Sequence, residues 1–165
     1  MSYMRRLANR VGHWPHLSRL RPIVVPVDRF LDTRTGGRRA LADLGGLPIA
    51  RLRVPGCKTG TLRTTTLMYV PHEPTSGRAW TLGDDIILIG SNWGGENHPL
   101  WTKNLMANPA CEVTIKGATV AMSAHLATGH ERQALWTESV RQWPAYQAYQ
   151  DRVGRELRVF LLTAA

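Results

Sequence analysis

Hydrophobic and polar positions change their pattern once along the chain. Residues 1–44 carry short apolar runs interrupted by Pro15, Pro22 and Pro26, which predicts a segment of short helices and irregular structure. From residue 47 onward, alternating or continuous apolar positions bounded by glycine and proline predict strands. The expected strands span residues 47–54, 61–70, 86–91, 111–115, 120–126 and 156–162.

One helix is expected inside this strand region, after a pair of glycines. Trp101, Leu105 and Asn108 share one side of it, at spacings i, i+4 and i+7. Pro99 is tolerated in its first turn, and Pro109 ends it. The helix would therefore connect two strands of the sheet.

A pair of helices is expected before the last strand. Thr128 and Glu131 fit the S/T-x-x-E capping box that opens a helix, and Pro144 ends or bends that helix. A second short helix then carries Tyr146 and Tyr149. Several short strands joined mostly by hairpins favour a small barrel over an alternating α/β sheet.

Composition leaves an ordinary globular protein as the simplest class. The chain has 165 residues, of which 43% are hydrophobic and 20% charged, which fits one domain with its own core. No apolar run approaches the ~20 residues of a membrane span, and no secretory signal is recognised. Cys57 and Cys111 give neither a disulfide framework nor a zinc site, so a reducing, cytoplasmic compartment is expected.

The positive charge is concentrated in the first quarter of the chain. The net charge is +9, and residues 1–40, with nine Arg and two Asp, contribute +7 of it. Such a basic end favours an anionic partner. Nucleic acid is not expected, because no nucleic-acid-binding motif accompanies the charge. An anionic membrane surface, a polyanionic cofactor and a merely solvated basic face remain open.

The first candidate site is the glycine-bounded turn at residues 56–60. Successive backbone N–H groups in such a turn can point at an anion. Lys58 adds a point charge, and Arg63 offers a planar fork for phosphate or carboxylate. The same residues also fit a plain hairpin with exposed cations, and spacing alone leaves both interpretations open.

The second candidate site is the passage from the strand at 86–91 into the following helix. Unpaired N–H groups at a helix start favour anionic or carbonyl groups of a ligand. Trp101 is expected to pack in the core. Asn104 is polar beside an apolar stripe, so it needs a partner, which is either backbone or ligand.

The third candidate site is an aromatic cluster near the end of the chain. Trp143, Tyr146 and Tyr149 recur every three residues and gather loosely on one face. A phenol there can donate a proton, stack on a flat ring or simply complete a core.

Together and in this order, these motifs resemble the deazaflavin-dependent nitroreductase family of actinobacteria, whose members use coenzyme F420. The resemblance runs from about residue 47 to 162 and rests on GCKTG…R, GSNWGG..HPLWTKNLMANP, HERQALW, WPAYQAYQ and RELRVFLL. It implies a mainly β (α+β) fold over residues 45–165, namely a split β-barrel of about six mostly antiparallel strands with flanking helices, as in FMN-binding oxidases. Residues 1–44 would form a separate basic segment.

The resemblance also implies where F420 binds. The phosphate and glutamate tail would be held by Lys58, Thr59 and Arg63. The deazaflavin ring would be lined by Thr64, Thr65, Thr66, Leu67 and Met68, by Ile89, Gly90, Ser91 and Asn92, and by Leu100, Trp101 and Asn104. Tyr146 would cover the reacting face and Tyr149 would line the substrate pocket, which makes both candidate catalytic residues.

The sequence departs from the family pattern at several positions near the expected site. Cys57 stands where the family commonly has Arg, which removes one cation from the tail site. Thr66 stands where many members have Pro. Asn92 stands where one subgroup has Lys, and Trp93 is an extra residue. The segment at 72–85 is longer than usual.

The function implied is an F420-dependent oxidoreductase. It would pass hydride from reduced F420 to an electron-poor acceptor, such as a quinone, an activated C=C bond or a nitroaromatic compound. The alternatives are an FMN-dependent oxidoreductase on the same fold and a non-catalytic F420 carrier. The basic N-terminal segment also suits peripheral contact with the inner face of the plasma membrane, and split barrels often form homodimers.

Overall fold

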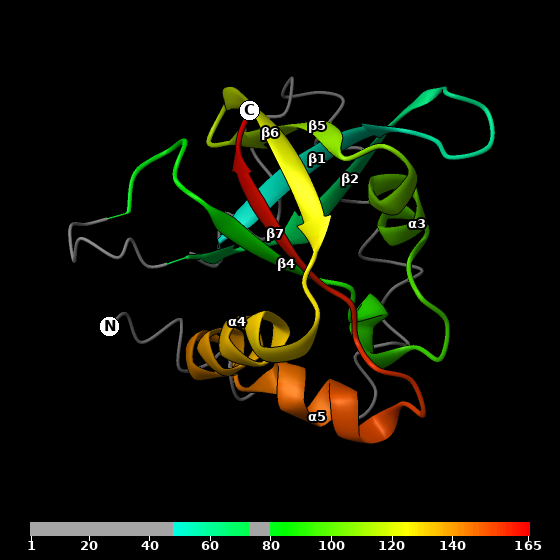
Figure 1. Cartoon of the computed structure of the whole chain (residues 1–165), viewed down its shortest axis with the longest axis vertical. Coiled ribbons are helices and arrows are strands. Elements are labelled where there is room, and N and C mark those ends of the chain that lie inside the picture. The colour runs from blue at the N-terminus through cyan, green and yellow to red at the C-terminus, as the bar shows by residue number, and fades with distance from the viewer. Residues whose placement is uncertain (1–47, 73–79) are drawn as a thin grey trace.

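Seven antiparallel strands form one sheet at the centre of the fold (Figure 1). The computed structural model describes residues 48–72 and 80–165, so the structure expected for residues 1–44 lies outside the described residues. The strands are β1 (Ile49–Pro55), β2 (Leu62–Met68), β3 (Val70–Pro71), β4 (Ile86–Ile89), β5 (Ala110–Ile115), β6 (Ala118–Leu126) and β7 (Val159–Ala164). Their order in the sheet is β2-β1-β5-β6-β7-β4-β3.

The two outer strands of this order are consecutive in sequence, which closes the sheet on itself. Only Tyr69 separates β2 from β3. β2 pairs with β1, whereas β3 pairs with β4 through Val70 and Ile87. The barrel therefore splits between β2 at one end of the strand order and the β3–β4 pair at the other. This is the split β-barrel expected from the sequence, with the strand predicted at 61–70 divided in two.

The continuous apolar sequence of β4 is explained by its position between two hydrophobic cores. Ile86 and Leu88 pack in the first core, inside the barrel, with Leu52, Phe160 and other residues of the strands. Ile87 and Ile89 pack in the second core, between the sheet and the helices near the C-terminus. Burial on both faces favours apolar side chains at every position of a strand.

In the part of the chain that the structure describes, three α-helices flank the barrel (Figure 1): α3 (Leu100–Ala107), α4 (Gly129–Gln142) and α5 (Ala145–Arg152). α4 and α5 lie together below the sheet in Figure 1, and α3 lies apart from them. Pro144 separates α4 from α5 as predicted. Pro99 precedes α3 with extended backbone (ψ 145°) and does not lie in its first turn.

Two further local predictions were wrong, both because a nearby side chain bonds to a different partner than expected. The capping box does not form: Thr128 occupies the N-cap position without a side-chain cap bond, and Glu131 instead bonds His125 Nε2 at 2.8 Å. The last strand begins at residue 159 rather than 156. The Leu157 N–H donates to Gln150 Oε1 at 2.8 Å, which ties the preceding residues to α5 and not to the sheet.

Candidate functional site

Within the hairpin tip between β1 and β2, most backbone N–H groups are already bonded. Gly56 donates to the Thr61 carbonyl at 2.9 Å, and Gly60 donates back to the Gly56 carbonyl at 2.8 Å. The Thr61 N–H donates to Thr59 Oγ1 at 3.3 Å. Gly60 has φ +68°, a conformation that glycine adopts without strain. An anion at this hairpin would therefore be held mainly by side chains.

Asn104 joins α3 to this hairpin tip. Its Oδ1 accepts a hydrogen bond from the Cys57 N–H at 3.0 Å. Asn108, at the end of α3, donates through Nδ2 to the Pro55 carbonyl at 3.3 Å. The side chain of Asn104 is buried, so the partner that its burial requires comes from the backbone.

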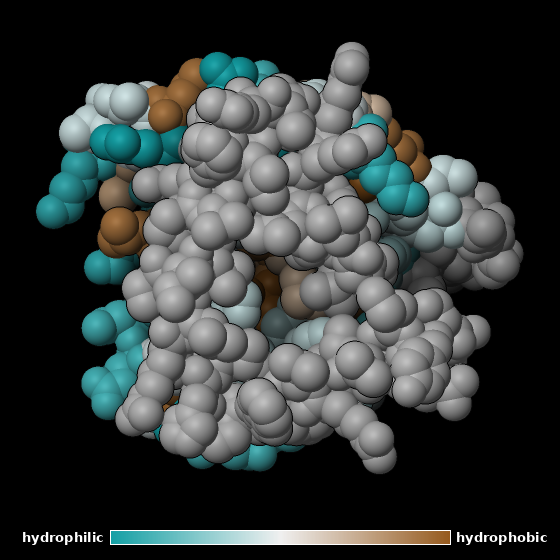
Figure 2. Space-filling model, turned by 180° about the vertical axis from the view of Figure 1, so that it is seen from behind, coloured by the Kyte–Doolittle hydropathy of each residue, from teal (hydrophilic) through white to brown (hydrophobic). Residues whose placement is uncertain are grey.

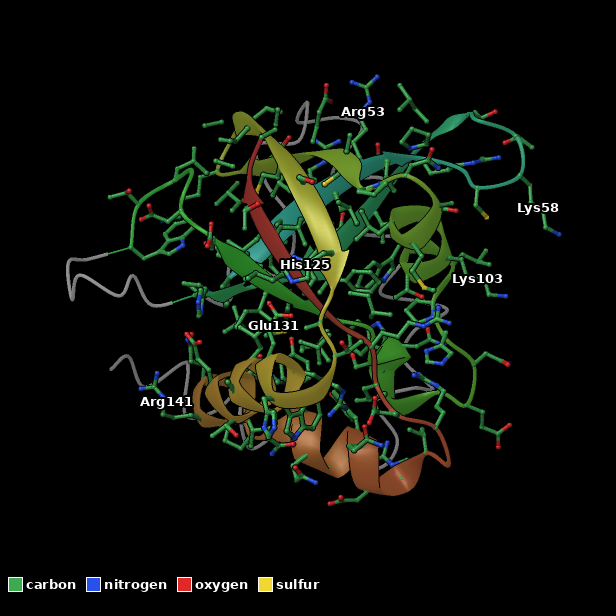
Figure 3. The ribbon with its side chains drawn as sticks, in the orientation of Figure 1. Arg53, Lys58, Lys103, His125, Glu131 and Arg141 are labelled. Carbon is green, nitrogen blue, oxygen red and sulfur yellow. The ribbon has the colours of Figure 1, made fainter. Side chains whose placement is uncertain are left out.

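Three cations are exposed on the hairpin and on α3. Lys58 and Lys103 both point outward on the same side of the molecule (Figure 3), and Arg63 is exposed near the start of β2. No Asp or Glu occurs in residues 56–71 or 97–111, so the sequence around these cations is free of acids. Such a surface attracts polyanions. Lys103 was not predicted as a site residue, although it lies in the same acid-free stretch.

The other residues expected on α3 differ in their exposure. Trp101 packs in the barrel core, with its ring centroid 5.7 Å from that of Phe160. Leu100 is 76% exposed. The core position predicted for Trp101 is thus confirmed, and Leu100 is the residue of this set that lies open to solvent.

Along β2 the expected site residues change from exposed to half-buried. Thr64 is exposed, whereas Thr65 and Thr66 are half-buried. Leu67 packs against the first core and Met68 against the second. The strand therefore has solvent near the cations and apolar surroundings near the helices. On the opposite side of the molecule, the described residues visible in Figure 2 include hydrophobic ones near the centre and both hydrophilic and hydrophobic ones along the left and upper margins.

The residues after β4 form a left-handed turn. Gly90 is buried, and a Cβ at this position would lie 2.9 Å from Thr102 Cγ2. Asn92, Trp93 and Gly94 have φ values of +50°, +58° and +73°. A left-handed conformation costs a non-glycine residue about 1–2 kcal/mol, so surrounding contacts must hold this turn.

Arg155, between α5 and β7, makes five hydrogen bonds to the residues on either side of this turn. Its guanidinium donates to four backbone carbonyls of the loop, those of Gly90 (3.2 Å), Ser91 (3.3 Å), Gly95 (2.9 Å) and Glu96 (2.8 Å). It also bonds His98 Nδ1 at 3.1 Å. No spacing in the sequence pointed to Arg155, because its partners lie far earlier in the chain.

Tyr146 and Tyr149 project from α5 into the second core, where both are buried. Burial, with the nearby Tyr149 phenol adding to it, raises the pKa of Tyr146 far above its usual value. Burial also raises the pKa of Tyr149, against the opposing effect of Arg152. Both phenols therefore keep their protons at neutral pH. A Cβ on Gly94 would lie 3.2 Å from Tyr149 Cδ1, so the left-handed turn and α5 are in direct contact.

Comparison of the sequence with known proteins agrees with this geometry. Residues 27–164 match the family described as F420H(2)-dependent quinone reductase. The chain is similar to the F420H(2)-dependent quinone reductase Rv1261c of Mycobacterium tuberculosis (strain ATCC 25618 / H37Rv). The two are 30% identical over 133 residues, which cover 78% of this chain and 82% of that protein.

Two solved structures are similar in fold. One is described as an F420-H2 dependent reductase, FDR-A, with 28% identity and a TM-score of 0.58 over 70% of this chain and 93% of that chain. The other is described as a domain-swapped dimer, with 26% identity and a TM-score of 0.61 over 85% of this chain and 96% of that chain.

These comparisons define the class as oxidoreductases that depend on F420. The chain belongs to the F420H(2)-dependent quinone reductase family. The family resemblance, the cofactor and the enzymatic activity expected from the sequence are thereby confirmed at the level of the family. The described residues also fit the cofactor, because Lys58 and Lys103 point outward on one side of the molecule and Arg63 is exposed near the start of β2, a set of cations that suits an anionic tail.

Proposed function

We propose that this chain reduces a quinone with hydride from F420, at a site that runs from the hairpin tip to α5. The observation that carries the proposal is the presence of two unlike surfaces along one strand. Exposed cations surround the start of β2, and the second core, which contains Tyr146 and Tyr149, surrounds its end. A cofactor with an anionic tail and a flat redox ring requires both kinds of surface.

The tail is held at the hairpin and α3. Lys58, Thr59 and Arg63 contact its phosphate and carboxylate groups, and Lys103 adds a third cation. The planar guanidinium of Arg63 can bind two oxygens at once, whereas the lysines act as point charges. Asn104 contributes indirectly, because it fixes the hairpin that carries Lys58 and Thr59.

The ring is held where β2 separates from the residues after β4. Thr64, Thr65, Thr66, Leu67 and Met68 contact it from the strand, and Ile89, Gly90, Ser91 and Asn92 contact it from the other side of the split. Leu100 meets it from α3, and Trp101 supports that helix from the core. The half-buried state of residues 65–68 supports this placement, because it leaves part of each side chain open to a ligand.

When bound in its reduced form, F420 supplies the hydride, and the protein supplies orientation and exclusion of water. Holding the acceptor against the ring makes the encounter nearly unimolecular. Tyr146, directly or through a water molecule, donates a proton to the acceptor oxygen that gains charge. The phenol carries its proton at neutral pH, as a donor must, and burial raises its pKa, which makes it a weaker acid than a free tyrosine. Tyr149 lines the acceptor pocket.

The basic residues 1–40 suit peripheral contact between a cytoplasmic protein and an anionic membrane, where lipid quinones reside. In residues 48–72 and 80–165, no helix is long and apolar enough to cross a membrane. Co-sedimentation with anionic vesicles, with and without residues 1–44 and over a salt series, tests the contact. Binding that ignores both salt and truncation would contradict it.

A homodimer is a further part of the proposal. Split barrels often pair, and the similar structure described as a domain-swapped dimer supports pairing here. Light scattering or sedimentation at several protein concentrations measures the state directly. A monomer at every concentration would contradict it.

Binding and turnover together test the proposed function. Fluorescence quenching should give micromolar affinity for F420 and much weaker binding of FMN, and a soluble naphthoquinone should oxidise reduced F420 only when the protein is present. Tighter binding of FMN would favour the FMN-dependent alternative. Tight binding of F420 without oxidation by quinones, enones or nitroaromatics would favour a carrier.

A further inference from the structure

Arg155 has no role in the proposed function so far, yet it lies at the centre of the loop between β4 and α3. Four carbonyls and one imidazole of residues 90–98 accept hydrogen bonds from it. Its own position is between α5, which carries the two tyrosines, and β7. It therefore connects the loop on one side of the barrel split to the end of the helix that carries Tyr146 and Tyr149.

We propose that Arg155 is a positioning residue of the redox site, which holds the left-handed turn at residues 92–94 in the geometry that the cofactor ring and Tyr149 require. The inference deepens the proposed function and rests on it.

The turn has little support of its own. Gly94 donates to the Ser91 carbonyl and Gly95 donates to the Asn92 carbonyl, each at 3.0 Å. Asn92 Nδ2 donates to the Asn97 carbonyl at 2.9 Å. These three bonds accompany two non-glycine residues in the left-handed region, each of which carries a conformational cost. Arg155 adds bonds on both sides of the turn, to the carbonyls of Gly90 and Ser91 before it and of Gly95 and Glu96 after it.

Arginine is suited to this task by the geometry of its donors. The guanidinium is planar and has five N–H groups, so one side chain can satisfy several carbonyls that converge from different directions. A lysine at the same place has three donors on a single nitrogen. A lysine would keep the charge. Its single nitrogen could not, however, donate to the carbonyls of Glu96, Gly90 and Gly95 from the different directions that the three guanidinium nitrogens provide.

The bond to the Ser91 carbonyl also fixes the direction of a neighbouring donor. In a trans peptide the carbonyl and the N–H of one plane point in opposite directions. Because the Ser91 carbonyl points to Arg155, the Asn92 N–H points away from it. No carbonyl of the described residues accepts from that N–H. Ser91 (φ −71°, ψ −30°) followed by left-handed Asn92 is a backbone sequence that presents N–H groups to electron-rich atoms.

The same turn sets the position of Tyr149. Gly94 lies against the Tyr149 ring, with space for no side chain at van der Waals distance, and the Arg152 guanidinium lies 5.9 Å from the centre of that ring. A shift of the turn would therefore shift the ring or open a gap beside it. Small displacements of this kind reduce turnover more than affinity when most of the binding contacts lie elsewhere.

Hydrogen exchange measured by mass spectrometry on the full chain without cofactor is the first test. In Arg155→Gln, amides of residues 90–98 should exchange at least about tenfold faster than in the wild type, while those of β1 and β5 do not change. In Arg155→Lys, the exchange rates of these amides should lie between those of the wild type and those of Arg155→Gln. Arg53→Gln is the matched control, since it removes one exposed arginine that pairs with Glu112 far from the loop, and it should leave residues 90–98 unchanged.

Kinetics with F420 complete the test. In Arg155→Gln, kcat should fall roughly 10–100-fold, while the dissociation constant of F420 stays within about threefold of the wild-type value. Exchange equal to the wild type, or faster exchange with wild-type kcat, would overturn the proposal. If Arg155→Gln does not fold, the exchange rates, kcat and F420 affinity of Arg155→Lys are compared with those of the wild type instead. Absence of turnover in the wild type would instead defeat the proposed function itself, so the two failures are distinguishable.

Discussion

The amide oxygen of Asn104 accepts a hydrogen bond from the backbone N–H of Cys57 at 3.0 Å, and this bond joins α3 to the tip of the β1–β2 hairpin. The two residues are 47 positions apart in the chain. Because Lys58 follows Cys57 and Lys103 precedes Asn104, the same bond fixes the spacing between two of the cations that we assign to the cofactor tail. The geometry of the proposed tail site therefore depends on this buried amide, together with the bond from Asn108 Nδ2 to the Pro55 carbonyl.

Replacement of Asn104 by leucine should weaken F420 binding and lower stability. The Cys57 N–H would lose its protein partner, at a cost of about 0.5–1.5 kcal/mol in the free energy of unfolding, since Cys57 is exposed and water can replace the amide. We expect affinity to fall several-fold, measured by fluorescence quenching beside urea denaturation. Gln133→Leu, on the exposed face of α4, is the control. Wild-type affinity in Asn104→Leu would show that the hairpin position does not govern tail binding.

Replacement of Cys57 by arginine should tighten F420 binding. Cys57 is exposed at the hairpin tip beside Lys58, so a guanidinium there would add a further cation near the anionic tail. An exposed ion pair contributes up to about 1 kcal/mol, which corresponds to roughly a fivefold gain in affinity. The gain should shrink at high salt. Cys57→Ser adds no charge and should bind as the wild type does; an equal gain in both variants would mean that charge is not the cause.

Replacement of Tyr146 by phenylalanine should lower turnover much more than cofactor affinity. The ring and its packing in the second core are kept, and only the phenolic donor is lost. We expect kcat to fall roughly 100-fold, the lower end of the contribution of a general acid. Steady-state kinetics with a soluble naphthoquinone and an F420 titration make the comparison. Equal kcat in the variant would remove the role assigned to Tyr146.

Acidification should loosen the loop that Arg155 holds, through His98. Burial first, and then the charges of Arg158, Arg155 and Lys103, lower the pKa of His98 from 6.5, so the native state favours the neutral imidazole. Nδ1 accepts from Arg155 only when it carries no proton. The contribution of His98 to stability is therefore present above pH 6.5 and is lost as the pH falls from 6.5 through the lowered pKa.

Thermal unfolding at several pH values between about 7.5 and 5 measures this dependence. The wild type should lose more stability on acidification than His98→Gln, which cannot gain a proton. His130→Gln, on the exposed first turn of α4, should follow the wild type. Parallel curves for the wild type and His98→Gln would contradict the assignment.

The barrel could be predicted from the sequence because its patterns are local. The uninterrupted apolar run of β4 indicated burial on both faces, and the alternation in β5 indicated one buried face; both hold in the structure. The helix that carries Trp101 was likewise predicted from the spacing of residues on its buried side, and the break between the last two helices was predicted from Pro144. In each case the deciding interaction lies within a few residues, or the burial pattern reports it directly.

The parts that could not be predicted depend on partners distant in the chain. The need of Asn104 for a partner was evident, but the identity of that partner was not, since the hairpin reaches α3 only in the folded state. Glu131 is an exception, because its partner His125 is only six residues away; the imidazole at the end of β6 takes the place of the helix backbone as partner of this carboxylate. Arg155 reaches carbonyls about 60 residues earlier, so no local pattern marks it.

β7 is the strand that joins the two parts of the sheet. It lies between β6 and β4 and pairs with both of them. Without β7 the remaining strands would form two disconnected ladders, one of β2, β1, β5 and β6 and one of β4 and β3. Detachment of residues 159–164 would therefore expose the edges of β6 and β4, and bare strand edges of this kind can pair with other chains.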